Sequence, residues 1–126
     1  MRKIIQTSKA PAAIGPYSQA VFHSGILYTS GQIAINAETG ELDDENIEIE
    51  TKRVLRNLQA VLDAADLTFS NVIKTTIFLK SMNDFEQVNA VYASFFTSVF
   101  PARETVEVAK LPKNVNVEIS MIACKD

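Results

Sequence analysis

A period-two alternation over residues 115–123 is the sequence feature that most constrains the fold. One set of alternate positions is entirely apolar: Val115, Val117, Ile119, Met121 and Ala123. The positions between them are polar, except for Ile122. Because successive side chains of a strand point to opposite faces of a sheet, this segment predicts a strand with one face in a core and one mixed face.

Two segments have the period of a one-sided helix, which would need a flat partner such as a sheet. The first, over residues 54–65, follows possible N-caps at 43–46 and precedes Asp66, a residue that tolerates the left-handed conformation. The second starts near Asn83, which has Glu86 at capping-box spacing, and extends to Pro101. Its apolar stripe is Phe85, Val88, Tyr92, Phe95, Phe96 and Val99.

The other predicted strands are residues 20–23 and 26–29 around a Ser24-Gly25 turn, the β-branched run 72–79, and 105–108. This order predicts one α+β domain over residues 1–126, a two-layer sandwich with both helices on one face of the sheet. The opposite face, which includes Ile122, then lacks a cover. That predicts a homo-oligomer in which copies cover this face for one another.

Composition excludes several kinds of chemistry. The 126 residues include one His and one Cys, too few for a Cys/His zinc site, and the net charge of −3 disfavours nucleic acid as a partner. The sequence has no phosphate-binding glycine loop, and it shows neither a signal-peptide core nor a membrane span, so we expect a cytoplasmic protein. His23 is interpreted as a strand residue and Cys124 as unreactive.

Two charged residues are candidates for a site. Arg103 begins a strand just after Pro101, where its guanidinium could act as a fixed fork for a carboxylate, with Thr105 on the same face. Glu118 lies on the polar face of the last strand, where it could orient a water or relay a proton. The alternative for each is an ordinary ion pair, of Arg103 with an acid or of Glu118 with a base.

Two loop segments and one amide complete the candidates. Residues 15–19, with Tyr17, combine Gly and Pro, and residues 29–32 offer the Ser30 hydroxyl and the Gly31 backbone N–H. Asn89 falls on the apolar stripe of the second helix and therefore needs a polar partner. A loop carbonyl is the simplest partner on physical grounds.

Taken together, these blocks resemble the RidA/YjgF family. The resemblance is carried by AIGPYSQA (13–20), TSGQI (29–33), NDF (83–85), VN (88–89), Tyr92, FPAR (100–103), VEVAKLPK (106–113) and VEI (117–119). It implies a chorismate-mutase-like α+β fold with a mixed sheet, assembled as a homotrimer with ligand clefts between subunits. It further implies hydrolysis of 2-iminobutanoate and 2-iminopropanoate to 2-oxo acids and ammonia, without metal or organic cofactor. The resemblance also implies a link to pyridoxal-phosphate dehydratases, which release such imines. Hydrolysis would limit the damage that the imines do to other enzymes.

Carried over residue by residue, the resemblance makes Arg103 the carboxylate ligand and Glu118 the acid that positions or activates water. Tyr17, Ser30, Gly31 and Asn89 match cleft positions. Thr105 replaces a Cys found in many members, so it offers a hydroxyl and no thiol, and Ser120 replaces a frequent second Glu. The alternative function is a non-catalytic protein that binds 2-oxo or amino acids, or protects against stress, through the same cleft.

Overall fold

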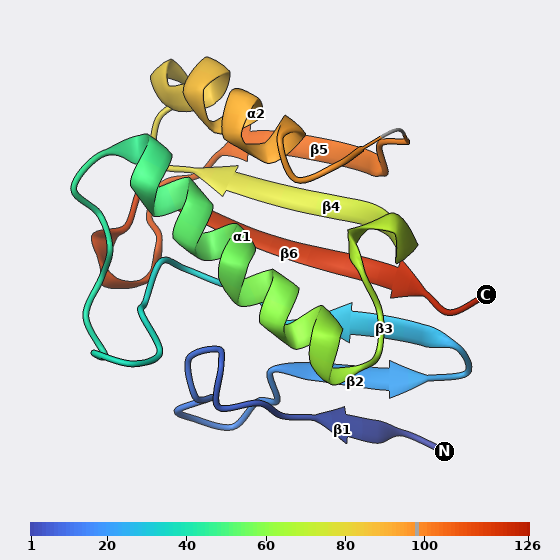
Figure 1. The fold of residues 1–126 in the computed structure, drawn as a ribbon. Coiled ribbons are helices and arrows are strands. Elements are labelled where there is room, and N and C mark those ends of the chain that lie inside the picture. Colours follow the sequence, from blue (N-terminus) through green and yellow to red (C-terminus); the bar gives the residue numbers. More distant parts are fainter. Residues whose placement is uncertain (98) are drawn as a thin grey trace.

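The computed structural model describes residues 1–97 and 99–126, in which two helices cover one face of a six-stranded sheet (Figure 1). The strands are β1 (Lys3–Ile5), β2 (Ala20–His23), β3 (Ile26–Thr29), β4 (Val72–Leu79), β5 (Ala102–Glu107) and β6 (Val117–Cys124). The helices are α1 (Ile47–Ala64) and α2 (Phe85–Ala93), with short 3-10 turns at Phe69–Asn71, Met82–Asp84 and Pro112–Asn114. The strand order is β1-β2-β3-β6-β4-β5, and among the strands that the structure describes only the β4–β5 pair is parallel. The predicted α+β sandwich with a mixed sheet is confirmed.

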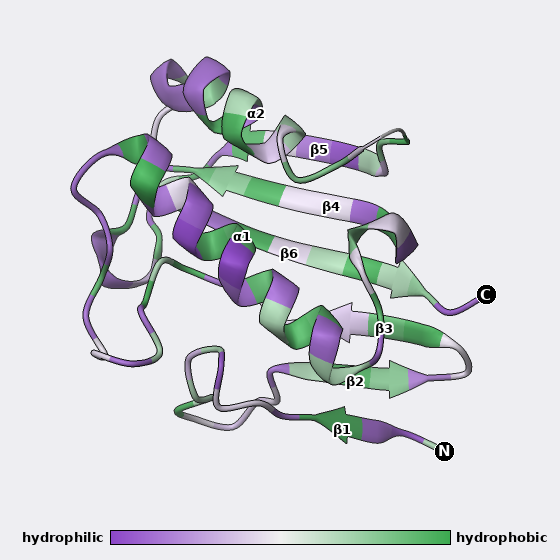
Figure 2. Cartoon of the chain, in the orientation of Figure 1, coloured by the Kyte–Doolittle hydropathy of each residue, from purple (hydrophilic) through white to green (hydrophobic). Residues whose placement is uncertain are grey.

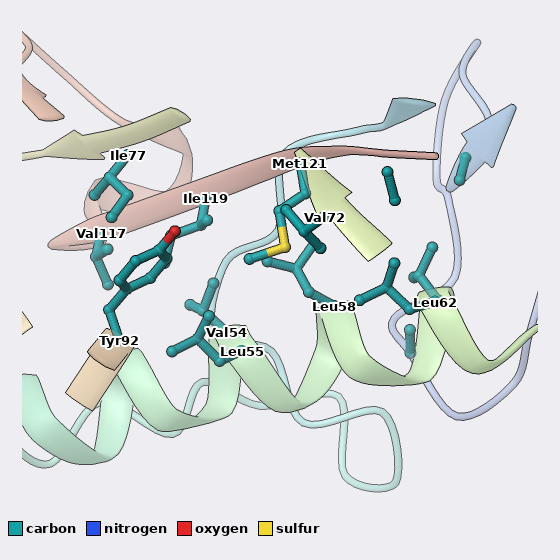
Figure 3. Packing of buried hydrophobic residues seen from close by; sticks show 14 of the residues in the cluster. Val54, Leu55, Leu58, Leu62, Val72, Ile77, Tyr92, Val117, Ile119 and Met121 are labelled. Carbon is teal, nitrogen blue, oxygen red and sulfur yellow. The ribbon is translucent and has the colours of Figure 1, made fainter. Parts of the chain in front are cut away.

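The centre of the molecule follows the sequence patterns closely. On β6, alternate residues from Val117 to Ala123 are buried against α1, whose Leu55, Leu58 and Leu62 are fully buried (Figure 3). The hydropathy colouring shows hydrophobic and hydrophilic residues alternating along α1 (Figure 2). The predicted β2–β3 turn is confirmed at Ser24 and Gly25, which both have positive φ, the conformation that a two-residue hairpin requires.

The ends of α1 are set by the predicted capping residues. The Asn46 side chain accepts a hydrogen bond from the Ile49 N–H at 2.8 Å. The helix therefore begins at Ile47, before the predicted range of 54–65. Asp66, just beyond the last turn, has a φ of 60°. This left-handed residue turns the chain toward β4.

The second helix is shorter than predicted. It ends at Ala93, and the prediction that it continues to Val99 is wrong for the described residues; position 98 lies outside them. Phe95 and Phe96 both place their rings 5.5 Å from the ring of Phe69. These two residues therefore pack on Phe69 from the segment that follows the helix.

Three further boundaries differ from the predictions. The Asn83–Glu86 capping box does not form; instead the Ser81 hydroxyl accepts from the Asn83 N–H at 3.1 Å. The fifth strand begins at Ala102, earlier than the predicted 105. Strand β1 was not predicted, because three residues at a sheet edge are too few to show a period. No helix among the described residues is long and apolar enough to cross a membrane.

The sheet face opposite the helices is only partly shielded in the single chain. Glu118, Ser120 and Ile122 of β6 are half-buried there, and Val106 of the edge strand β5 is 44% exposed. Apolar surface of this kind is a common feature of faces that pack against another copy.

Candidate functional site

Arg103 lies on the helix-covered face of β5 and is held by side chains of α2. Its Nη1 donates a 2.6 Å hydrogen bond to Oδ1 of Asn89. Its guanidinium carbon lies 5.2 Å from the centroid of the Tyr92 ring and 5.7 Å from that of Phe85. Asn89, spaced four residues from Phe85 and three from Tyr92, thus shares one helix face with both rings. The expected loop carbonyl is therefore not the partner of Asn89; that partner is Arg103.

The Arg103 side chain borders a cavity of about 360 Å³. The cavity is lined by Asn89, Tyr92, Ala93, Phe100, Pro101 and Arg103. Among the described residues, no carboxylate forms an ion pair with Arg103. The guanidinium, which has five N–H donors in total, therefore retains donors for an anion that enters this cavity.

Tyr92 links Arg103 to the core of the sheet. Its hydroxyl donates a 2.8 Å hydrogen bond to Oγ1 of Thr75, a fully buried residue of β4. Burial raises the pKa of the Tyr92 hydroxyl, and the Thr75 bond and the Arg103 charge only partly oppose that rise. The ring is thus neutral and fixed, a firm surface for the guanidinium to lie on.

Glu118 is positioned by close approach of the backbone at Gly31. A Cβ atom built on Gly31 would lie 2.8 Å from the Glu118 carboxyl carbon, closer than real contacts allow. Glycine at position 31 therefore makes room for this carboxylate. Burial raises the pKa of the Glu118 carboxyl above its ordinary value, and no ion pair with a base is present among the described residues.

Arg103 and Glu118 lie on opposite faces of the sheet within one chain. Arg103 pairs with Thr75 of β4, whereas Glu118 pairs with Phe78, three residues further along the same strand. Residues an odd number apart on a strand point to opposite faces. Within a single chain, Glu118 therefore does not lie beside Arg103.

The other candidate residues divide between these two faces. Thr105 shares the face of Arg103, and its buried hydroxyl has no hydrogen-bond partner among residues 1–97 and 99–126. Ser30 and Gly31 follow β3 on the Glu118 side, and the Ser30 hydroxyl donates to the Ser18 carbonyl at 2.6 Å. Tyr17 is 54% exposed in the neighbouring loop. His23 is exposed at the β2 turn, and Cys124 is half-buried at the end of β6.

Sequence reasoning missed two residues that hold Arg103. Phe85 and Tyr92 were predicted only as members of an apolar stripe, yet their rings flank the guanidinium. Their spacing around Asn89 was a usable signal, because aromatic residues on both sides of a polar one on a helix face offer a cation a place to stack.

The fold and these side chains define a small α+β protein with an arginine-lined pocket on one face of the sheet and a half-buried carboxylate on the other. A family model described as endoribonuclease L-PSP matches residues 7–125. The chain is 53% identical over 123 residues to the RutC family protein slr0709 of Synechocystis, covering 96% of this chain and 95% of that one. It is 47% identical over 128 residues to the 2-iminobutanoate/2-iminopropanoate deaminase of Escherichia coli K12, covering 99% of each.

A solved structure extends this similarity to the fold. Escherichia coli TdcF, crystallised with bound serine, matches with a TM-score of 0.95 at 41% identity, over 98% of this chain and 99% of that one. The chain belongs to the endoribonuclease L-PSP family, which is the RidA/YjgF family that the sequence motifs indicated.

Proposed function

We propose that this protein hydrolyses 2-imino acids, such as 2-iminobutanoate and 2-iminopropanoate, to 2-oxo acids and ammonia. The observation that carries the proposal is the Arg103 pocket, in which a guanidinium held by Asn89 and two rings has no protein carboxylate as partner among the described residues. A 2-imino acid presents a carboxylate next to its reactive carbon. The 47% identical relative named as a deaminase of these imines supports the same substrate class.

In this mechanism the substrate carboxylate pairs with Arg103, with the Thr105 hydroxyl as a further polar contact. Glu118 accepts a proton from water as the water oxygen bonds to the imine carbon, and the proton passes to the nitrogen. The hydroxyl of the tetrahedral adduct then gives up its proton, which passes to the amino nitrogen as the C–N bond breaks, so that ammonia leaves and the ketone of the oxo acid forms. The imine is intrinsically reactive, so positioning and one base suffice without a metal or cofactor.

The raised pKa of Glu118 suits this role. A carboxyl whose pKa moves toward neutrality becomes a stronger base when ionised. Since Arg103 and Glu118 face away from each other in one chain, the mechanism requires a second copy. We propose a homotrimer in which the Arg103 pocket of one subunit meets Glu118, Gly31, Ser30 and Tyr17 of its neighbour, with the half-exposed sheet face in the interface.

The description of the family model names an endoribonuclease, and the charge of this chain favours the imine substrate over RNA. The net charge is −3, whereas binding to a phosphate backbone depends mainly on basic residues. The proposal also places the protein in the cytoplasm beside pyridoxal-phosphate dehydratases, which release 2-imino acids and are exposed to them. The alternative function is binding of 2-oxo or amino acids without turnover, and a coupled assay distinguishes it from hydrolysis.

A coupled assay tests the activity. Threonine dehydratase converts threonine in the presence of semicarbazide, which traps the imine, and added protein should accelerate the formation of 2-oxobutanoate. Arg103→Ala should lose about 100-fold or more in kcat/KM, because charge-assisted hydrogen bonds to the carboxylate disappear. Arg2→Ala, at an exposed residue of the N-terminus, is the matched control and should retain full activity. An unaltered rate with Arg103→Ala would exclude the assigned site, and no acceleration by the native protein would favour the binding function.

A further inference from the structure

A second cavity, of about 860 Å³, lies between α1 and α2. Most of its walls come from matching positions on the two helices: 49, 52, 53 and 56 of α1, and 87, 90 and 91 of α2 with position 94 at its C-cap. Each set follows the i, i+3, i+4, i+7 spacing of one helix face. Ile49, Ala90 and Val91 provide an apolar floor. The volume is that of a pocket for a small organic molecule.

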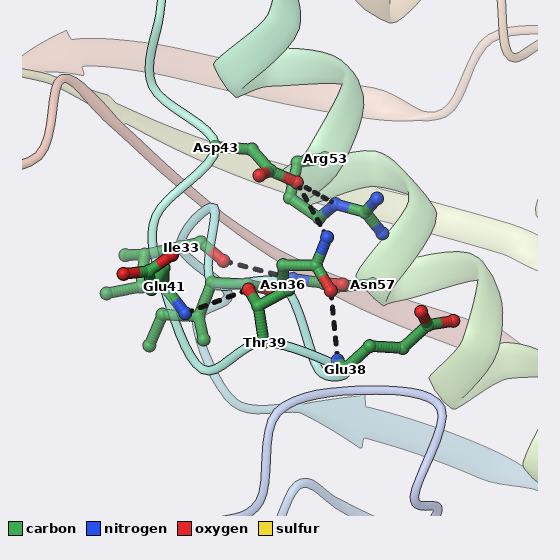
Figure 4. A network of polar contacts seen from close by, with 9 residues as sticks. Ile33, Asn36, Glu38, Thr39, Glu41, Asp43, Arg53 and Asn57 are labelled. Carbon is green, nitrogen blue, oxygen red and sulfur yellow. Dashed lines mark hydrogen bonds and ion pairs between the residues drawn. The ribbon is translucent and has the colours of Figure 1, made fainter.

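Basic residues concentrate along the α1 wall of this groove. Lys52, Arg53 and Arg56 fall within five residues of a chain whose net charge is −3. Arg53 donates through Nε to Oδ2 of Asp43 at 2.8 Å, and Asn36 donates to the same oxygen at 3.2 Å (Figure 4). This contact fixes the guanidinium through Nε only, so its two terminal amino groups remain as donors.

Arg56 is held by a different contact one turn further along α1. Its guanidinium carbon lies 5.6 Å from the centroid of the Phe95 ring, a cation–π contact that leaves the N–H edge of the group available. Neither Arg56 nor Lys52 forms an ion pair among the described residues. Two guanidinium groups fixed before any ligand arrives lose little entropy on binding an anion.

We propose that this groove binds a small amphipathic anion, with a carboxylate or phosphate on Arg53 and Arg56 and an apolar body over Ile49, Ala90 and Val91. Glu48 also lines the groove and disfavours ligands that carry negative charge along their whole length. The site is separate from the Arg103 pocket, whose cavity is lined by Asn89, Tyr92 and Ala93 from α2. It therefore stands or falls independently of the proposed deaminase activity.

An NMR titration of the full-length protein tests the site, with 4-phenylbutanoate as probe and uncharged 4-phenylbutanamide as its matched control. The protein carries Arg103→Ala, so that the probe carboxylate has no partner in the other pocket. Amide shifts are expected within 46–56 and 87–94 for the carboxylate. Arg56→Gln should weaken binding about tenfold by removing a charge-assisted contact, whereas Lys110→Ala, at an exposed residue outside the groove, should have no effect.

Three outcomes would overturn the proposal. They are the absence of groove shifts at probe concentrations up to about 10 mM, equal affinity for the amide, and unchanged affinity in Arg56→Gln. Arg53→Gln serves as a second variant in case Arg56→Gln disturbs α1. It should weaken binding of the carboxylate probe to a similar extent. Circular dichroism then checks that each variant keeps its helices.

Discussion

Arg103 and Glu118 are the two charged groups of the proposed site, and the protein positions them by different means. Arg103 is held by side chains, namely the Asn89 amide and the rings of Phe85 and Tyr92. The position of Glu118 depends on the backbone, because its carboxylate occupies space that only a glycine at position 31 leaves free.

This difference assigns distinct tasks to the two faces of the sheet. A guanidinium on an aromatic surface keeps its charge and presents donors, which suits the binding of a carboxylate. Burial raises the pKa of the Glu118 carboxyl above its ordinary value, which suits the exchange of a proton with water. Changes on the Glu118 face should therefore alter kcat and the pH profile, and changes on the Arg103 face should alter KM.

The largest expected effect comes from Glu118→Gln. Loss of a general base should lower kcat by about 10²- to 10⁴-fold. In the native protein, kcat/KM should rise with pH through the raised pKa of Glu118, because only the ionised carboxylate accepts a proton; the variant should lack that rise. Stopped-flow measurement of imine decay between pH 4 and pH 8 provides the profile, with Glu45→Gln, at an exposed residue just before α1, as control.

Glu118→Gln should lower activity but raise the stability of the fold at neutral pH. The folded-state pKa of Glu118 lies above its ordinary value of 4.5, so its contribution to stability is complete below that value and is lost as pH rises through the folded pKa. Gln cannot ionise, so the variant should unfold up to about 2 °C higher than the native protein at pH 7. A variant that is both inactive and less stable would indicate a structural role for Glu118.

Complementation between variants tests whether the two faces act across subunits. Neither Arg103→Ala nor Glu118→Gln should be active alone, yet trimers formed by co-expression of both should regain activity. If each site takes Arg103 from one subunit and Glu118 from its neighbour, random mixing leaves about a quarter of the sites intact. Co-expressed trimers that stay inactive, although mass spectrometry shows that they contain both variants, would place both groups in one subunit and contradict the proposed site.

Gly31→Ala should reproduce much of the Glu118→Gln defect without removing the carboxylate. The added methyl group would overlap the Glu118 side chain and displace it, so kcat should fall by about 10- to 100-fold while KM stays within about twofold. Gly40→Ala is a matched control because a Cβ at Gly40 meets no atom within 4 Å, although its φ of 77° adds strain. A loss confined to KM would show that Gly31 serves substrate binding alone.

The sequence predicted the centre of the fold well because local burial patterns determine it. The α1–β6 contact follows from the apolar spacing of each element, and the caps at Asn46 and Asp66 are local signals. Phe95 and Phe96, which follow the end of α2, contact Phe69, a residue more than twenty positions earlier, so no local window contains these contacts. Predictability therefore declines from the sheet centre toward the β5 edge.

The same distinction applies to the candidate site. Arg103 and Glu118 could be selected from residue type and position, but their faces depend on the register of β5 and β6 against β4. A shift of one residue in either register would put both on one side. The partner of Asn89 could not be predicted from the sequence either, because an amide on an apolar stripe accepts from any donor that the tertiary fold supplies.

Asn89→Ala should have a smaller effect, concentrated in KM. Without its only hydrogen-bond partner among the described residues, Arg103 keeps its charge and both ring contacts but loses one fixed direction. KM should rise about tenfold, the value of one charge-assisted hydrogen bond, with kcat nearly unchanged. Asn89→Asp separates charge from geometry, because a salt bridge would occupy Arg103 and should raise KM further. An effect on kcat alone would contradict the binding role of this face.

Tyr92→Phe should have the smallest effect and tests which part of Tyr92 matters. The substitution keeps the ring under Arg103 but removes the hydroxyl and leaves the buried Thr75 without this partner. The free energy of unfolding should fall by about 1–2 kcal/mol, measured by urea denaturation, while KM stays within about twofold. Thr75→Val in the same background should restore part of that loss, since an unpaired buried hydroxyl is then replaced by an apolar group of similar shape. If KM instead rises tenfold, the Tyr92 hydroxyl contributes to positioning Arg103. The hydrogen bond from Tyr92 to Thr75 of β4 would then be part of what fixes the guanidinium.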